Sequence, residues 1–105
     1  MIALVVRFDL RDANAAARFD ALTVQLVESV RAEEPGTLVY ATHTVDGEPL
    51  ARVFYEVYED QAAKQAHEAT EHVRAFLAER AELLAGRRVE FLSPSAAVGV
   101  PREED

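Results

Sequence analysis

The first residues of the chain are hydrophobic at almost every position. Residues 2–9 fit a β-strand in which Leu4 and Val6 lie on one side and Ala3 and Val5 on the other. A strand with one face in water normally alternates between apolar and polar residues. Because this strand begins apolar on both sides, we expect both of its faces to be covered.

A helical repeat follows over residues 13–33. Side chains between Asp9 and Asn14 can cap the start of a helix, and Pro35 with Gly36 ends it. Hydrophobic residues at helical spacing form a single stripe along this segment. The stripe consists of Phe19, Leu22, Leu26 and Val30.

Two further strands are predicted, with a tight turn between them. Residues 37–45 and 50–59 are rich in β-branched and aromatic residues, and Asp46-Gly47 lies between them. Asp-Gly between two such runs is a strong signal for a β-hairpin. A hairpin leaves no room for a helix between these strands, which excludes a doubly wound parallel sheet.

The rest of the chain predicts a second helical region and a fourth strand. Asp60 can cap this region, Thr70 can restart it after a bend, and Gly86 is expected just beyond its C-terminus. Residues 87–92 then form the fourth strand. Residues 96–100 add either a short edge strand or a segment that crosses to a partner.

The element order β-α-β-β-α-β is that of the ferredoxin-like α+β fold. In this fold two helices cover one face of a four-stranded antiparallel sheet. We expect residues 1–100 to form a single domain and residues 101–105 to form a charged C-terminal tail.

The second face of this sheet has no helix to cover it. The predicted strands place apolar residues on both faces, and an exposed apolar surface of this size usually marks an interface. A second copy of the chain, packed sheet against sheet, is the simplest cover, so a homodimer is predicted. The alternative is a loop or the C-terminal tail folded over that face.

The composition narrows the range of partners. The 105 residues carry a formal net charge of −8 and include no cysteine. The charge disfavours binding to nucleic acid or to an anionic membrane, and the lack of cysteine excludes disulfides, thiol nucleophiles and thiolate metal sites. The N-terminus has neither the basic start of a signal peptide nor an apolar run long enough to span a membrane. We therefore expect a soluble, cytoplasmic protein.

The first candidates for chemistry are two histidines in the second helical region, His67 and His72. Histidine is the side chain best suited to moving protons near neutral pH. On one continuous helix the two would point roughly 140° apart, a poor arrangement for holding a metal. A bend near Thr70 would bring both rings to one pocket. The alternative is that one ring packs at a helix junction while the other is solvated.

Several strand residues suit a pocket for a flat aromatic molecule. Tyr40 and Tyr58 each combine an apolar ring with a polar tip. Glu56 lies among large apolar residues, so it faces solvent, bridges a dimer or acts as a tuned acid or base; a rim or interface salt bridge is the most ordinary of these. Arg7 could orient an anionic oxygen, although we favour an ion pair with Glu56 across the sheet. His43 is expected to pack in an interface.

Three stretches of the sequence together point to a known family. They are Glu34-Pro35-Gly36-Thr37-Leu38-Val39-Tyr40, the run from Val53 to Asp60, and the residues Ala63, His67, His72 and Phe76. In order and spacing they resemble the antibiotic biosynthesis monooxygenase domain family over nearly the whole chain. The resemblance implies a dimeric α+β barrel with a pocket between each sheet and its helices.

The resemblance also implies a kind of chemistry. Several oxygenases of this family use no metal, flavin or haem. The substrate is deprotonated and its carbanion reacts with dioxygen, so the protein supplies a dry pocket, a base and a stabiliser for the anion.

Two subgroups of the family fit less well. Haem-degrading members use an Asn on the first strand and a Trp in the second helical region, where this chain has Arg7 and His67 and no Trp at all. The anthrone oxygenases depend on a Trp and an Asn, and Asn14 is the single Asn of the chain. We therefore expect no haem and no other cofactor or metal.

The function predicted on this basis is that of a cofactor-independent monooxygenase acting on a small aromatic, quinol or polyketide-like substrate. His67 or His72 would take the substrate proton, and Tyr58, Tyr40 or Arg7 would steady the developing oxyanion. The residues assigned to substrate binding are Tyr40, Arg7, Glu56 and Phe76.

Two other functions are kept as alternatives. A non-catalytic module of the same fold would bind a small ligand or a pathway partner. An open cavity holding a histidine and a tyrosine favours the enzyme, whereas a cavity filled by Phe and Leu favours the module. An isomerase would instead need an anion site near Arg7, Arg52 or Arg74.

Overall fold

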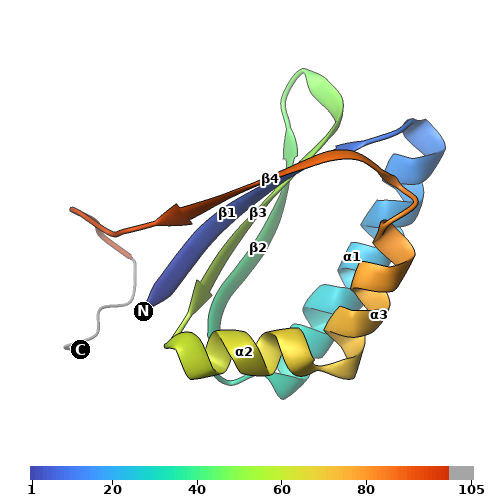
Figure 1. Cartoon of the computed structure of the whole chain (residues 1–105). Coiled ribbons are helices and arrows are strands. Elements are labelled where there is room, and N and C mark those ends of the chain that lie inside the picture. The colour runs from blue at the N-terminus through green and yellow to red at the C-terminus, as the bar shows by residue number, and fades with distance from the viewer. Residues whose placement is uncertain (100–105) are drawn as a thin grey trace.

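Four antiparallel strands form one sheet in the order β2-β3-β1-β4, and three helices lie on one of its faces (Figure 1). The computed structural model describes residues 1–99. The elements are β1 (Ile2–Leu10), α1 (Ala13–Glu33), β2 (Thr37–Val45), β3 (Glu48–Tyr58), α2 (Gln61–Ala69), α3 (Glu71–Arg80) and β4 (Leu84–Leu92). This architecture confirms the predicted ferredoxin-like α+β fold, with the second helical region divided into α2 and α3.

Helix α1 packs on the sheet through the stripe that the sequence predicts. The Asp12 carboxylate caps its start by accepting a hydrogen bond from the backbone N–H of Ala15 at 2.8 Å. The ring of Phe19 is fully buried, and Leu22, Leu26 and Val30 are buried along the same side. These side chains anchor α1 on the sheet.

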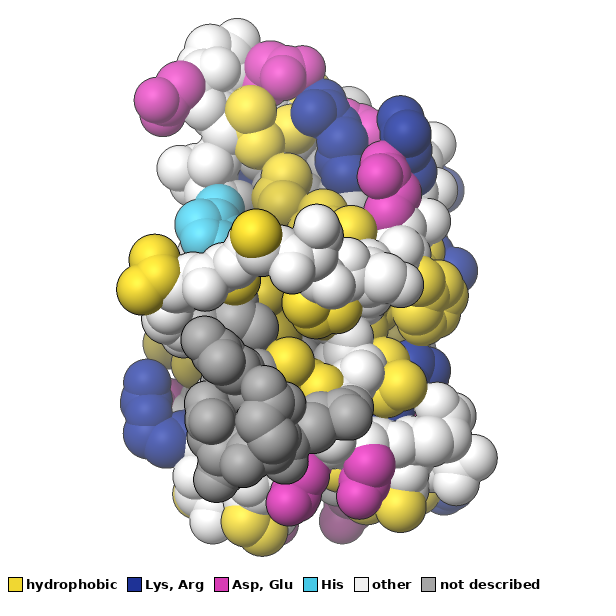
Figure 2. All heavy atoms as spheres, turned by 90° about the vertical axis from the view of Figure 1, so that its left-hand side faces the viewer, with side chains coloured by type: hydrophobic (Ala, Val, Ile, Leu, Met, Phe, Trp, Pro, Cys, Tyr) yellow, Lys and Arg dark blue, Asp and Glu magenta, His cyan; other side chains and the backbone are white. Residues whose placement is uncertain are grey.

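The alternation of side chains along the strands divides the sheet into two faces. Leu4, Val6 and Phe8 point toward the helices and belong to the buried core. The opposite face, here called the open face, carries mainly apolar side chains near its centre. They are Ala3, Val5, Val39, Ala41, Val53, Tyr55 and Val57. Figure 2 shows hydrophobic side chains gathered along the middle of this side of the molecule.

The residues that follow β4, as far as the structure describes them, add no further strand to the sheet. Residues 93–99 leave the sheet after Leu92 and are exposed throughout, with Val98 at 98% exposure. They form no strand, so the predicted edge strand over residues 96–100 is wrong for its described part, 96–99. Val100 and the predicted tail, 101–105, lie outside the described residues.

The end of the second helical region differs from the prediction. Helix α3 ends at Arg80, and Gly86 lies inside β4, opposite Asp9, rather than after a helix. The turn between them is fixed by a hydrogen bond from the backbone N–H of Leu83 to the Arg80 carbonyl at 2.9 Å. A glycine fits this strand position because a Cβ there would meet only the Asp9 carboxylate, at 3.9 Å.

A bend at Thr70 separates α2 from α3, as the sequence predicts. Thr70 ends α2 and also caps α3, since its hydroxyl accepts a hydrogen bond from the backbone N–H of Val73 at 3.3 Å. Helix α2 has a single buried residue, His67. Helix α2 is therefore anchored by a polar side chain, with Ala63 partly buried against the core, rather than by an apolar stripe.

Within residues 1–99, none of the helices combines the length and apolar character needed to cross a membrane.

Candidate active site

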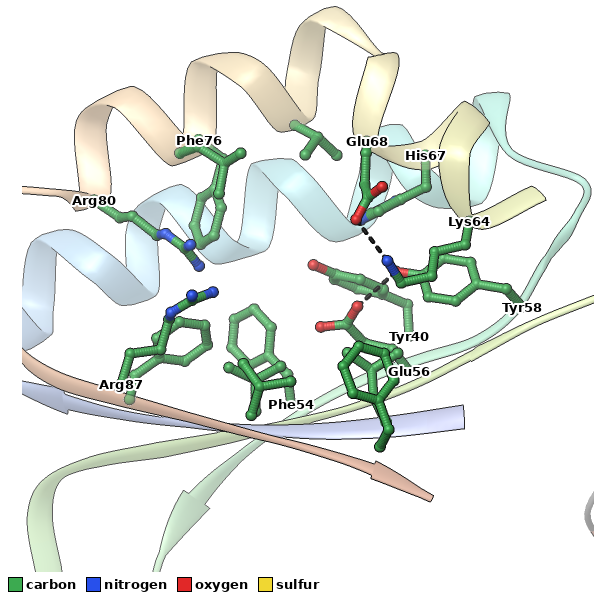
Figure 3. Close-up of a pocket in the computed structure, with 17 residues that line it drawn as sticks. Tyr40, Phe54, Glu56, Tyr58, Lys64, His67, Glu68, Phe76, Arg80 and Arg87 are labelled. Atoms are coloured by element: carbon green, nitrogen blue, oxygen red, sulfur yellow. Dashed lines mark hydrogen bonds and ion pairs between the residues drawn. The ribbon is translucent and has the colours of Figure 1, made fainter. Parts of the chain in front are cut away.

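A cavity of about 450 Å³ lies between the sheet and the α2-α3 region (Figure 3). All four strands and both of these helices contribute to its wall, whereas α1 does not. The apolar part of the wall is formed by Leu4, Val6, Phe8, Phe54, Val73, Phe76, Leu77, Val89 and Phe91. The polar part is formed by Tyr40, Glu56, Tyr58, Lys64, His67, Glu68, Arg80 and Arg87.

One buried carboxylate, Glu34, holds both histidines of the second helical region. Its Oε1 lies 2.6 Å from Nδ1 of His67 and accepts a hydrogen bond from the Thr37 hydroxyl at 2.7 Å. Its other oxygen lies 2.5 Å from Nε2 of His72. The side chains of Glu34 and His67 are each only 6% exposed. The bend at Thr70 therefore brings the two rings to one acid, and neither ring is solvated as the alternative required.

These contacts fix which ring nitrogen of each histidine carries a hydrogen. Although burial raises the pKa of Glu34, the hydrogen bonds with His72, Thr37 and His67 outweigh it and lower this pKa overall. Glu34 is therefore an ionised carboxylate at neutral pH, and a carboxylate only accepts hydrogen bonds. Nδ1 of His67 must then donate, which leaves Nε2 of a neutral ring with a free lone pair.

The His67 ring lies beside two tyrosines at one end of the cavity. The His67 ring centroid is 5.2 Å from that of Tyr40 and 5.1 Å from that of Tyr58. Within residues 1–99, Nε2 of His67 makes no hydrogen bond. His67 thus has the arrangement of a general base: one nitrogen is held by a carboxylate and the other is available to a ligand.

Glu56 and Tyr58 form a second polar pair in the cavity wall. The Tyr58 hydroxyl donates a hydrogen bond to Oε1 of Glu56 at 2.5 Å. Burial raises the pKa of Glu56, and the hydrogen bond from Tyr58 only partly opposes this effect. Burial, together with the negative charge of Glu56, raises the pKa of Tyr58, which therefore stays protonated. The rim or interface salt bridge expected for Glu56 is absent from the described residues.

Tyr40 offers a hydroxyl that nothing in the described part of the chain occupies. Its ring packs against Phe54 and His67, and Figure 3 shows its oxygen pointing into the cavity. Burial raises its pKa far above the ordinary value, and the charge of Glu56 acts in the same direction. The hydroxyl therefore remains a hydrogen-bond donor at any ordinary pH.

The other end of the cavity carries two arginines, Arg80 on α3 and Arg87 on β4 (Figure 3). The Arg80 guanidinium lies over the rings of Phe8 and Phe76, at 5.1 and 5.7 Å from their centroids. Burial and the nearby charge of Arg87 lower the pKa of Arg80. Lys64, near the opposite end, is paired with Glu68 at 2.7 Å.

The structure separates Arg7 from the other predicted site residues. Arg7 lies on the open face, where its guanidinium binds Asp9 at 3.1 Å and Glu48 at 2.9 Å. The predicted pair with Glu56 is wrong because Glu56 lies opposite Leu4, on the helix-covered face. Arg7 therefore does not line the cavity to which it was assigned.

The remaining predicted residues divide into three groups. His67, Tyr40, Tyr58, Glu56 and Phe76 line the cavity. His72 is connected to it only through Glu34, and His43 is exposed on the open face, with Nδ1 3.0 Å from the Val53 carbonyl oxygen.

Of the arginines considered for an isomerase, two are neutralised by carboxylates. These are Arg7, described above, and Arg52, which binds Asp20 through two contacts of 2.8 and 2.9 Å. Arg74 is exposed and does not line the cavity.

Glu34, the residue that organises the site, was quoted above only as part of a motif. One signal marked it: Glu34 lies at the C-terminal end of a helix, where a negative charge is unfavourable. An acid kept at such a position needs positive or donating partners from elsewhere in the fold.

Within residues 1–99, no cluster of three or more histidines and carboxylates is arranged to hold a metal ion.

Comparisons with known proteins agree with this fold. No curated protein matches the chain. A crystal structure from Caulobacter crescentus, provisionally assigned as an antibiotic biosynthesis monooxygenase, superimposes with a TM-score of 0.83 at 27% identity and covers 90% of each chain. Another antibiotic biosynthesis monooxygenase structure gives 0.82 at 25% identity, covering 91% of this chain and 100% of the other. The protein Rv0793 of Mycobacterium tuberculosis gives 0.83 at 24% identity, covering 93% and 98%, and supports the fold alone.

The sequence itself matches the model of one family, antibiotic biosynthesis monooxygenase, over residues 1–79. The matched segment contains Tyr40, Glu56, Tyr58 and His67, which line the polar end of the cavity, and Glu34, which binds His67. The chain therefore belongs to the antibiotic biosynthesis monooxygenase family.

Proposed function

We propose that this protein is a cofactor-independent monooxygenase that acts on a phenolic, quinol or polyketide-like aromatic substrate and works as a homodimer. The observation that carries the proposal is the pairing of His67 with Glu34 beside an open cavity. An ionised carboxylate behind an imidazole holds the ring in the orientation of a base and stabilises the imidazolium that forms.

The chemistry needs little beyond these groups. Nε2 of His67 removes a proton from an activated carbon or hydroxyl, and the resulting anion reacts with dioxygen. For an activated methylene, one oxygen atom enters the product as a carbonyl while the two hydrogens leave with the other oxygen atom as water. The Tyr40 hydroxyl is placed to donate a hydrogen bond to the developing oxyanion, whereas Tyr58 already donates to Glu56.

The cavity supports the enzyme over the non-catalytic alternative. A volume of about 450 Å³ is within the range of small-molecule sites. The cavity is open and contains a histidine and two tyrosines, rather than being filled by Phe and Leu. This is the arrangement that was expected to favour an enzyme.

The test is oxygen consumption with a panel of anthrones and quinols. We expect the His67→Ala variant to lose roughly 10²- to 10⁴-fold in kcat/KM with the best substrate, the usual contribution of a general base. His72→Ala should lose less, because this ring acts only through Glu34.

Gln65→Ala serves as the matched control, since Gln65 is exposed on α2, the helix that carries His67, and does not line the cavity, so its removal should leave the rate unchanged. Equal rates for the unaltered protein and His67→Ala would refute the assignment of the base. A panel on which the unaltered protein consumes no oxygen would favour the ligand-binding module.

A further inference from the structure

Two arginines without carboxylate partners face one end of the cavity. Arg80 and Arg87 both line it, and within residues 1–99 neither makes an ion pair. Within the same residues Arg11 and Arg74 also make no ion pair, but neither of them lines the cavity. Other arginines of the chain do have acidic partners: Arg7, Arg18, Arg31, Arg52 and Arg88.

The surroundings of Arg80 and Arg87 strengthen their interaction with a bound anion. Arg80 is half-buried over two phenylalanine rings, and the charge of Arg87 lies close enough to lower its pKa. Arg87 is exposed, whereas Arg80 is partly desolvated, and the negative charge of Glu56 acts on Arg80 more weakly than the positive charge of Arg87 does. The pair therefore keeps an excess of positive charge that an anion can neutralise. A guanidinium also presents two parallel N–H groups, which match the two oxygens of a carboxylate.

The cavity therefore has two chemically different ends and an apolar middle. Figure 3 shows Arg80 and Arg87 at one end, with His67, Tyr40 and Glu56 at the other. Phe54 lies between them in the picture, in a wall that is otherwise aliphatic and aromatic. A ligand that satisfies all three parts has a flat apolar body, an acidic hydroxyl or methylene at one end and an anion at the other.

Building on the proposed function, we infer that the substrate is an aromatic carboxylic acid whose carboxylate binds between Arg80 and Arg87 while its phenolic end reaches His67. The two arginines select the substrate and set its direction in the cavity. They take no part in the proton transfer, which occurs at the other end.

The probe is 6-hydroxy-2-naphthoate, which carries a hydroxyl and a carboxylate at opposite ends of a flat ring system. Its neutral partner is 6-hydroxy-2-naphthamide, and 6-hydroxynaphthalene-2-sulfonate offers a tetrahedral anion instead. Binding is followed by the fluorescence of the naphthol under argon, so that no turnover is needed. We expect the carboxylate to bind at least roughly tenfold more tightly than the amide, as charge-assisted hydrogen bonds allow.

Four variants locate the effect. Arg87→Gln and Arg80→Gln should each remove most of the preference for the carboxylate while leaving binding of the amide unchanged. Arg88→Gln is the matched control: Arg88 lies opposite Arg7, on the other face of the same strand, and should change nothing. Because Arg80 also packs on Phe8 and Phe76, Arg80→Lys is included to keep the positive charge if the Gln variant unfolds.

The outcomes separate this inference from the proposed function. Equal binding of the carboxylate and the amide, or a preference that survives in Arg87→Gln, would overturn the inference alone. Tighter binding of the sulfonate than of the carboxylate would overturn the choice of a planar acid. Failure of all three probes to bind would overturn both the inference and the aromatic substrate of the proposed function.

Discussion

At the scale of single residues, the candidate site depends on one carboxylate that ends a helix. Glu34 is the C-cap of α1, where the helix dipole opposes a negative charge. Hydrogen bonds from Thr37 and the two histidines compensate for this position and for burial. The position is unfavourable in isolation and becomes favourable only when β2, α2 and α3 have assembled around it. The same carboxylate therefore stabilises the fold and orients His67, the proposed base.

The lowered pKa of Glu34 predicts how stability depends on pH. Above its ordinary pKa of 4.5 the carboxylate is charged in both the folded and the unfolded chain, so its contribution is fully present. As the pH falls below that value the unfolded chain takes up the proton first, and the contribution is lost. Glu34→Gln should therefore lower the free energy of unfolding by about 2 kcal/mol at neutral pH and by less in acid.

Urea unfolding of both proteins at neutral pH and below pH 4.5 measures this difference. Glu33→Gln is the matched control, because Glu33 is the neighbouring acid, is 65% exposed and lies 3.7 Å from His72. It should change stability little at either pH. A Glu34→Gln effect that is the same at both pH values would contradict the assignment of a buried, ionised Glu34.

Individual residues show where sequence reasoning reaches the site and where it stops. Tyr40, Glu56 and Tyr58 could be predicted because strand alternation places them with the core residues on one face. The same alternation, applied to Arg7, would have excluded it from the site. Glu34 and the pair Arg80 and Arg87 could not be predicted, because their roles depend on which elements meet in space rather than on local pattern.

At the scale of elements, the position of α2 decides whether there is a cavity. Helix α2 approaches the start of β2 where Gly36 follows Glu34 and Pro35. A Cβ on Gly36 would lie only 2.7 Å from the Cβ of Ala63 on α2. Gly36 does not have a positive φ, so the glycine is needed for space rather than for backbone conformation. This close approach brings His67 within reach of Glu34.

Gly36→Ala should therefore displace α2 and weaken the site. We expect a loss of about 1–3 kcal/mol in stability, as for other overpacked contacts. Activity should also fall, because α2 carries His67. Urea unfolding and oxygen-consumption rates measure the two effects.

The clash that Gly36→Ala creates can be relieved by removing the Cβ of Ala63 on α2. Ala63→Gly alone should cost about 1 kcal/mol, because glycine disfavours helix. If the two Cβ atoms clash as the structure indicates, Gly36→Ala combined with Ala63→Gly should be clearly less destabilised than the sum of the single changes. If the losses of stability in the two single variants simply add up in the double variant, the contact between Gly36 and Ala63 is not what excludes a larger residue at position 36.

Elements with their own local signals could be predicted, and the one without such a signal could not. The bounds of α1 follow from the Asp12 cap and the Pro35 stop, and the two-residue turn follows from Asp46-Gly47, where Gly47 has a φ of +79°. The start of β4 at Leu84 has no such signal, because it is set by pairing with Leu10 on a distant strand. Gly86 was therefore mistaken for the end of a helix.

At the scale of the whole molecule, the open face of the sheet remains to be covered. Tyr55 lies at its centre, between Val5 on β1 and Ala41 on β2. Ala3 and Val57 on this face are already buried within the chain, at 4% and 0% exposure, whereas Val5 and Tyr55 are only partly buried. The helices occupy the other face, so a second copy of the chain can bind here without blocking the space between the sheet and α2-α3.

We expect the protein to form a dimer of the 11.6 kDa chain through this face, measured by light scattering after gel filtration. Tyr55→Glu should yield a folded monomer, because a symmetric interface would bury the new charge twice without a partner. Val24→Glu makes the same kind of change on α1, where Val24 is 66% exposed, and should leave the dimer intact. An unaltered protein that stays monomeric at micromolar concentration would show that the apolar open face is stable in water, and the homodimer would have to be abandoned.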